Sequence, residues 1–166
     1  MYKHAALAVA LALALSTPFG AAFAADQADE TAATLKITTQ DDRATRTDLS
    51  QYFTGDVLVN PLFAAEDASR ATAAEVTFEP GARTNWHVHP VGQQLVVTHG
   101  VGRVQIEGQP VRSLHVGDVV WIPGGANHWH GASADHSMTH IAMQERRDGQ
   151  NVVWGNKVTD TQYRAQ

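Results

Sequence analysis

Short apolar runs, each ended by glycine, proline or asparagine, fill the chain from Tyr52 onward. Runs of about four to eight residues between turn-forming residues are typical of β-strands and are too short for most helices. Only residues 159–164 are compatible with a helical turn. The sequence therefore predicts an all-β domain, built as a small sandwich or a barrel. The runs cover residues 56–59, 73–78, 95–98, 101–106, 118–122, 138–144 and 151–154.

Composition limits the classes of protein to which the chain can belong. It has 166 residues, 43% of them hydrophobic, which suits one domain with a core once the ends are discounted. The formal net charge is -5 and no basic cluster exceeds Arg146 and Arg147, so a nucleic-acid partner is not expected. Cysteine is absent, which excludes disulfides and thiolate ligands. Histidine must therefore supply any soft metal ligand.

The N-terminus has the pattern of a secretory signal peptide. Lys3 and His4 precede an apolar run at residues 5–15, and Ala-Phe-Ala at residues 22–24 forms a cleavage site. We therefore predict a signal peptide over residues 1–24, a flexible leader over residues 25–50 and the folded domain over residues 51–166. The mature protein is then expected to be periplasmic or secreted, without membrane contact. The alternative is an uncleaved N-terminal anchor.

Two segments carry three histidines and one glutamine that can meet. His87 and His89 lie two residues apart, so on a strand both side chains point to the same face, and Gln93 returns to them after a turn. His128 follows a second apolar run and can lie beside the first segment in a closed β-structure. We predict that His87, His89, Gln93 and His128 bind one divalent transition-metal ion and leave positions open for a substrate. The alternative is that these histidines have ordinary surface or core roles.

The spacing of these residues resembles the two signature motifs of the cupin superfamily. The glycine, histidine and proline positions of both motifs are matched by Gly81, His87, His89, Gly100, Gly117, Pro123, Gly125 and His128. Gln93 replaces the usual acid of the first motif, and Ala132 replaces the usual asparagine of the second. The resemblance implies a single cupin jelly-roll barrel, also called a double-stranded β-helix. The amide in place of a carboxylate raises the net charge of the metal site and makes the bound ion a stronger Lewis acid.

A closer resemblance is carried by residues 56–63, 74–82, 138–145 and 154–163. These segments are similar to those of small bacterial cupins that include the manganese-dependent (R)-selective hydroxynitrile (mandelonitrile) lyases. The resemblance covers residues 52–164 and implies Mn(II) as the metal, although Fe(II) or Zn(II) would also suit the ligands. The same segments occur in small cupins that accompany carboxymuconolactone decarboxylases, so the resemblance does not fix the substrate.

Candidate catalytic residues lie close to the second motif and on a later strand. His130 is two residues beyond His128 and would face the same cavity. The lyase resemblance places His140 and Gln144 in the pocket, and the alternatives are a core histidine and a surface glutamine. Ala74, Val76 and Phe78 share one face of a strand and would form either an apolar pocket wall or ordinary core. Arg83 is expected on the surface.

We interpret the chain as a metal-dependent lyase that cleaves a cyanohydrin to an aldehyde and cyanide. Two alternatives stay open: an iron-dependent cupin dioxygenase that activates O2 at the same centre, and a periplasmic module that binds or senses a small molecule. The expected partners are a small-molecule substrate and further copies of the chain, because apolar sheet faces of small cupins commonly pack between subunits.

Overall fold

A computed structural model describes residues 34–66 and 68–165 of the chain. The predicted signal peptide, residues 1–24, and residues 25–33 of the predicted leader lie outside the described residues. The described residues from residue 37 onward form one compact unit. In the described part of the chain, no helix has the length and apolar character needed to cross a membrane.

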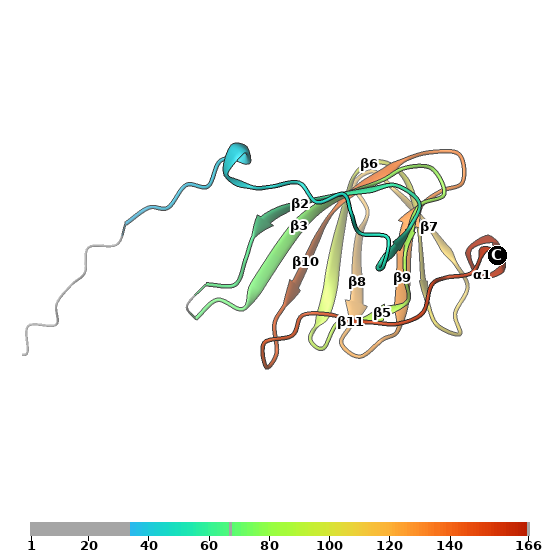
Figure 1. Cartoon of the computed structure of the whole chain (residues 1–166). Coiled ribbons are helices and arrows are strands. Elements are labelled where there is room, and N and C mark those ends of the chain that lie inside the picture. The colour runs from blue at the N-terminus through green and yellow to red at the C-terminus, as the bar shows by residue number, and fades with distance from the viewer. Residues whose placement is uncertain (1–33, 67, 166) are drawn as a thin grey trace, which may run out of the picture. The chain divides into compact units, whose positions relative to one another are not determined.

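The regular secondary structure of the described residues is almost entirely β, as predicted (Figure 1). A 3-10 helix, η1 (Gln40–Asp42), precedes the strands, and the helix α1 (Asp160–Arg164) falls at the predicted C-terminal turn. The strands are β1 (Phe53–Thr54), β2 (Val57–Phe63), β3 (Ala71–Phe78), β4 (Arg83–Thr84), β5 (His87–Val88), β6 (Gly92–Ile106), β7 (Arg112–His115), β8 (Val119–Pro123), β9 (His128–Ala132), β10 (Met138–Glu145) and β11 (Val153–Trp154).

The strands form two layers that close into a barrel, and β6 belongs to both layers. Its first half, residues 92–96, pairs with β8 and β10, and β3 and β2 continue this first layer. Its second half, residues 101–106, pairs with β7 and β9 in the second layer. The layers therefore share one continuous backbone, which bends at Gly100, where φ is +73°.

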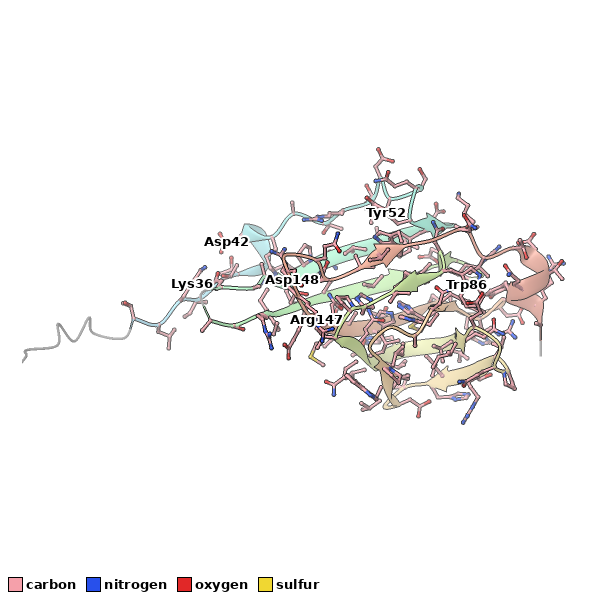
Figure 2. All side chains as sticks on the ribbon, turned by 90° about the horizontal axis from the view of Figure 1, so that it is seen from below. Lys36, Asp42, Tyr52, Trp86, Arg147 and Asp148 are labelled. Atoms are coloured by element: carbon pink, nitrogen blue, oxygen red, sulfur yellow. The ribbon has the colours of Figure 1, made fainter. Side chains whose placement is uncertain are left out.

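Side chains from both layers fill the barrel (Figure 2). Phe78, Leu95 and Met138 are completely buried in this core. Cross-strand register places Val59 opposite Val76 and Val76 opposite His140. Paired residues of antiparallel strands point to the same face, so these three side chains form one row across the interior. The row therefore places the imidazole of His140 inside an apolar core.

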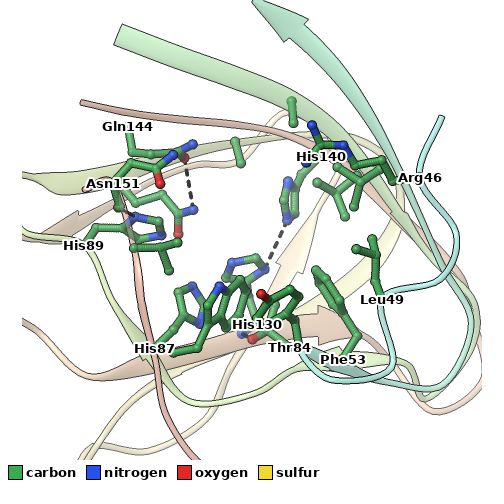
Figure 3. Close-up of a pocket in the computed structure, with 18 residues that line it drawn as sticks. Arg46, Leu49, Phe53, Thr84, His87, His89, His130, His140, Gln144 and Asn151 are labelled. Atoms are coloured by element: carbon green, nitrogen blue, oxygen red, sulfur yellow. Dashed lines mark hydrogen bonds between the residues drawn. The ribbon is translucent and has the colours of Figure 1, made fainter. Parts of the chain in front are cut away.

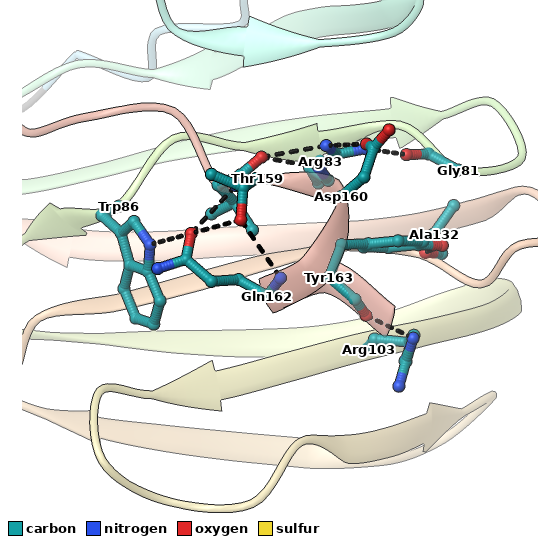
Figure 4. Close-up of polar contacts among 10 residues, drawn as sticks. Gly81, Arg83, Trp86, Arg103, Ala132, Thr159, Asp160, Gln162 and Tyr163 are labelled. Atoms are coloured by element: carbon teal, nitrogen blue, oxygen red, sulfur yellow. Dashed lines mark hydrogen bonds and ion pairs between the residues drawn. The ribbon is translucent and has the colours of Figure 1, made fainter. Parts of the chain in front are cut away.

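The C-terminal segment is fastened to the second layer by Arg83 and Tyr163 (Figure 4). Arg83 donates to the Val158 carbonyl at 2.9 Å and pairs with Asp160 at 2.6 Å. The Tyr163 hydroxyl donates to the Ala132 carbonyl at 2.9 Å. The expectation that Arg83 lies on the surface is wrong, because α1 and the residues before it cover it and leave it 7% exposed.

A second set of buried side chains lies between the barrel and α1. Trp86 packs there with Trp129, Val158 and Tyr163, and its indole nitrogen donates to Gln162 Oε1 (Figures 2 and 4). Trp86 and Trp129 flank His87 and His128 along the chain, so the packing of this segment holds two histidine-bearing strands in place.

The bend of β6 should not tolerate a side chain at residue 100. A Cβ atom on Gly100 would lie 1.9 Å from the Ser137 carbonyl oxygen. Gly108 has a similar φ of +77°, but a Cβ there would meet no described atom within 4 Å. We expect Gly108→Ala to lower the free energy of unfolding by about 1 kcal/mol through backbone strain, and Gly100→Ala by a further 1–3 kcal/mol, roughly, through the clash. Chemical denaturation of both variants measures the difference, and equal losses would contradict the expected clash.

Candidate metal centre and cavity

The rings of His87 and His128 are each oriented by a hydrogen bond to a nearby backbone carbonyl. The Nδ1 atom of each ring donates to a backbone carbonyl two residues earlier, Asn85 and Ala126, at 2.9 Å in both cases. A neutral imidazole that donates through Nδ1 keeps a lone pair on Nε2. The two residues are also paired in register between β5 and β9, and their ring centroids are 4.1 Å apart. Both rings therefore offer a metal-binding nitrogen in the same place.

His89 follows β5 and lies beside this pair. Its ring centroid is 5.2 Å from that of His87 and 5.7 Å from that of His128. Its Nδ1 atom donates to the Asn151 carbonyl, and its buried Nε2 atom has no partner among the described residues. A buried polar atom without a partner is costly and points to a missing ligand.

Gln93 is the second residue of β6 and faces His128 from the other layer. Its Oε1 atom is 3.1 Å from His128 Nε2. The Thr72 hydroxyl donates to the Gln144 carbonyl, so its oxygen must accept from the Gln144 side-chain NH2 group, 2.9 Å away. This orientation turns Gln144 Oε1 toward the Gln93 NH2 group at 3.4 Å. Thr72 thereby fixes both amides and aims the Gln93 oxygen at His128.

The contact between Gln93 and His128 brings two lone pairs together. Burial lowers the pKa of His128 to about 4, so the ring is neutral at neutral pH. Its single hydrogen is on Nδ1, which donates to Ala126, and Nε2 therefore has none to donate to Gln93. Two acceptor atoms at this distance repel each other unless a cation is bound to both. The donor set of imidazole nitrogens and an amide oxygen thus fits a divalent transition-metal ion.

His130, expected as a catalytic residue, also lies in the histidine group. Ring nitrogens of His87, His128 and His130 all lie within 4.8 Å of one another. His130 Nδ1 is 3.1 Å from His140 Nε2, and His130 Nε2 is buried with no partner in the described part of the chain. Burial holds the pKa of His130 well below its usual range and lowers that of His140 to about 4. Both rings are therefore neutral.

A cavity of about 350 Å³ opens beside the histidines (Figure 3). His87, His89 and Gln93 line one side of it, and the predicted catalytic residues His130, His140 and Gln144 also face it. His128 is completely buried behind this surface. Of the predicted apolar wall, Ala74 and Val76 line the cavity, whereas Phe78 belongs to the core.

Other residues of the site were missed by sequence reasoning. Thr72 lies two residues before Ala74 on β3, so strand alternation alone places it on the cavity face. Asn151 reaches His89 from the loop after β10, and Arg46 lines the cavity from the segment before β1. Arg46 belongs to no periodic pattern, and the predicted run at residues 151–154 did not indicate that Asn151 would contact His89.

Comparison with known proteins identifies the fold and the family. Residues 74–142 match the family model described as Cupin domain. The chain is 55% identical over 115 residues to a (R)-mandelonitrile lyase of Granulicella tundricola, which is 69% of this chain and 88% of the relative. The chain belongs to the cupin superfamily.

Solved structures agree with this membership. A cupin-like protein from Thermotoga maritima matches this cupin with a TM-score of 0.66 and 42% identity, covering 71% of this chain and 90% of the other. A cupin-2 domain from Rhodospirillum rubrum matches with a TM-score of 0.59 at 18% identity, covering 78% of this chain and 84% of the other. At this identity the match is evidence for the fold only. The predicted superfamily and jelly-roll barrel are confirmed, and the cupin carries a three-histidine group that can bind a metal ion.

Removing the Thr72 hydroxyl should loosen the metal centre. In Thr72→Val the shape is kept, but the Gln144 and Gln93 amides lose the partner that fixes their orientation. We expect metal affinity to fall about tenfold, as is typical for residues that orient metal ligands. Competition with a fluorescent chelator measures the Mn(II) dissociation constant. Thr72→Ser keeps the hydroxyl and should bind Mn(II) as tightly as the parent does. An unchanged Mn(II) affinity in Thr72→Val would show that the Thr72 hydroxyl does not orient the two amides.

The buried neutral histidines should make the metal-free protein sensitive to acid. The pKa of His128 and that of His140 are lowered by burial from an ordinary value of 6.5 to about 4, so between these values the unfolded chain binds more protons than the folded protein. The free energy of unfolding is therefore expected to fall as the pH drops from about 6.5 to about 4, by on the order of 3 kcal/mol for each ring. Denaturation in the presence of a chelator across this range measures the slope. His140→Gln should make the free energy of unfolding depend less on pH, whereas His115→Gln, at an exposed position, should leave the dependence unchanged. A free energy of unfolding in the parent that does not change over this pH range would contradict the burial argument.

Proposed function

We propose that this cupin is a metal-dependent lyase that cleaves a cyanohydrin into an aldehyde and hydrogen cyanide. The observation that carries the proposal is the cavity itself, where the histidine and glutamine centre, the His130–His140 pair and an apolar wall face one another. The 55% identity to a (R)-mandelonitrile lyase supports the same reaction class.

The metal would be held by His87, His89, Gln93 and His128, with Mn(II) as the proposed ion. When bound, it supplies Lewis acidity that lowers the pKa of a substrate hydroxyl. All four ligands are neutral, so none of them reduces the positive charge of the centre. His89 Nε2, which has no partner among the described residues, is the ring atom that His89 would contribute.

His130 is the proposed acceptor of the hydroxyl proton. Its Nε2 atom is free when its Nδ1 hydrogen is donated to His140 Nε2, 3.1 Å away. The hydroxyl proton passes to His130 Nε2, the carbonyl forms, and the C–CN bond breaks with its electron pair going to cyanide. The donation to His140 stabilises the positive charge that His130 gains in this buried place.

His140 and Gln144 are the proposed partners of the departing cyanide. With Nε2 accepting from His130, the His140 hydrogen is on Nδ1, which has no partner among the described residues. Gln144 uses one amide hydrogen on Thr72 and keeps a second one free. These donors stabilise the developing anion, which takes the His140 Nδ1 proton while His130 passes its Nδ1 proton to His140 Nε2, and leaves as hydrogen cyanide. Ala74, Val76 and Ala142 provide an apolar surface for the aldehyde part.

The reaction is tested with mandelonitrile and Mn(II)-loaded protein under anaerobic conditions. We expect benzaldehyde and cyanide to be released, and the metal-free protein to be inactive until Mn(II) is restored. His140→Ala should lower turnover by roughly 10²-fold to 10⁴-fold with metal content unchanged, the range for a positioned proton-transfer group. Gln144→Ala should also lower turnover, and it is assayed at saturating Mn(II) because Gln144 also orients Gln93. His115→Ala, on the exposed strand β7, is the matched control and should have parental turnover.

Two other results would replace the lyase proposal. Consumption of O2 with an enol or diketone substrate by Fe(II)-loaded protein, without cyanide release from mandelonitrile, would favour the dioxygenase alternative. Tight binding of small molecules without turnover, unaffected by His130→Ala, His140→Ala or Gln144→Ala, would favour the binding module.

A further inference from the structure

Arg46 reaches the cavity from the segment that precedes β1. Its backbone pairs with Val59 of β2 through two hydrogen bonds, of 2.9 Å and 3.0 Å. Directly paired residues of antiparallel segments project to the same face, and Val59 lines the cavity. The Arg46 side chain therefore also points to the cavity, and it is one of the lining residues. Figure 3 shows Arg46 and Leu49 across the cavity from His87 and His89.

Sheet register places Arg46 in one row with His140, whose ring contacts His130 at the proposed reaction site. Val59 is paired with Val76, and Val76 is paired with His140. Arg46, Val59, Val76 and His140 thus form one transverse row on the cavity face, with neighbouring backbones about 4.8 Å apart. Two valines separate the guanidinium at the rim from the imidazole in the interior. A ligand lying along this row would meet a cation, then an apolar surface, then the His130–His140 pair.

The guanidinium is available to a ligand. The Arg46 side chain makes no hydrogen bond or ion pair with any described residue, and the residue is exposed. No aspartate or glutamate is found among the described residues that line the cavity. Arg46 therefore provides an unbalanced positive charge at the rim.

We propose that Arg46 is a subsite for an anionic group at the end of the substrate remote from the metal centre. The substrate class is a small hydroxyl compound with a carboxylate at its far end and an apolar body that lies over Val59 and Val76. The guanidinium presents paired N–H donors that match a carboxylate. The inference rests on the proposed function for the reacting end only. It concerns which molecules bind, independently of whether cyanide is released.

Binding of two matched unreactive ligands tests the subsite. We compare 4-(hydroxymethyl)benzoate with 4-(hydroxymethyl)benzamide, which has almost the same shape and no charge, on Mn(II)-loaded full-length protein by titration calorimetry. The parent should bind the benzoate more tightly by about fivefold, the size expected for a partly solvated ion pair. Added salt should reduce this preference. Arg46→Gln should abolish it.

Arg43→Gln is the matched control. It removes the same charge from the same segment, three residues away, at a position that does not line this cavity. This variant should keep the parental preference for the benzoate. The same preference in Arg46→Gln as in the parent would mean that the metal centre holds the carboxylate, and would overturn the proposal. Equal binding of the two ligands by the parent would also overturn it.

A separate assay distinguishes this inference from the lyase proposal. Mandelonitrile and 4-carboxymandelonitrile are offered to the same preparations, and cyanide release is measured. Loss of the benzoate preference in Arg46→Gln without cyanide release from either compound would refute the lyase reaction and support the subsite. Cyanide release with equal affinity for both ligands would support the lyase reaction and refute the subsite.

Discussion

Polar side chains inside this barrel must find partners where water cannot supply them, and this requirement organises the site. Backbone carbonyls of Asn85 and Ala126 hold the rings of His87 and His128, and the Thr72 hydroxyl holds the two glutamine amides. The partners that remain missing are concentrated at the histidines. Of the five buried side-chain polar atoms that have no partner among the described residues, three are ring nitrogens of His89, His130 and His140, where a ligand is expected.

Alternation along strands made much of the fold and site predictable. Residues two apart on a strand share a face, and this rule predicts His87 beside His89, His130 beside His128, and His140 on the same face as Gln144. The resemblance to cupins then implied the jelly-roll barrel in which the two motifs come together. The metal-binding and catalytic roles of these residues remain predictions.

Contacts made by segments without periodicity could not be predicted. Arg83 is buried because residues 158–160 fold back over it. The residues next to Arg83 in the sequence do not indicate this burial. Arg46 likewise reaches the cavity from a loop. The closeness of His130 to His87 depends on how β4, β5 and β9 meet, a three-dimensional relation that spacing along one strand does not contain.

The passage of β6 through both layers limits how this protein can change over time. Gln93 faces inward from the first half of the strand, and β9, with His128 and His130, pairs with the second half. Insertion or deletion of one residue between the halves would reverse the facing of every side chain on one side of the change. Substitutions can alter the cavity one contact at a time, but a change of chain length here would dismantle the centre in a single step. Diversification of this cupin is therefore expected to proceed through residue exchange within β6 and through length variation only in the loops.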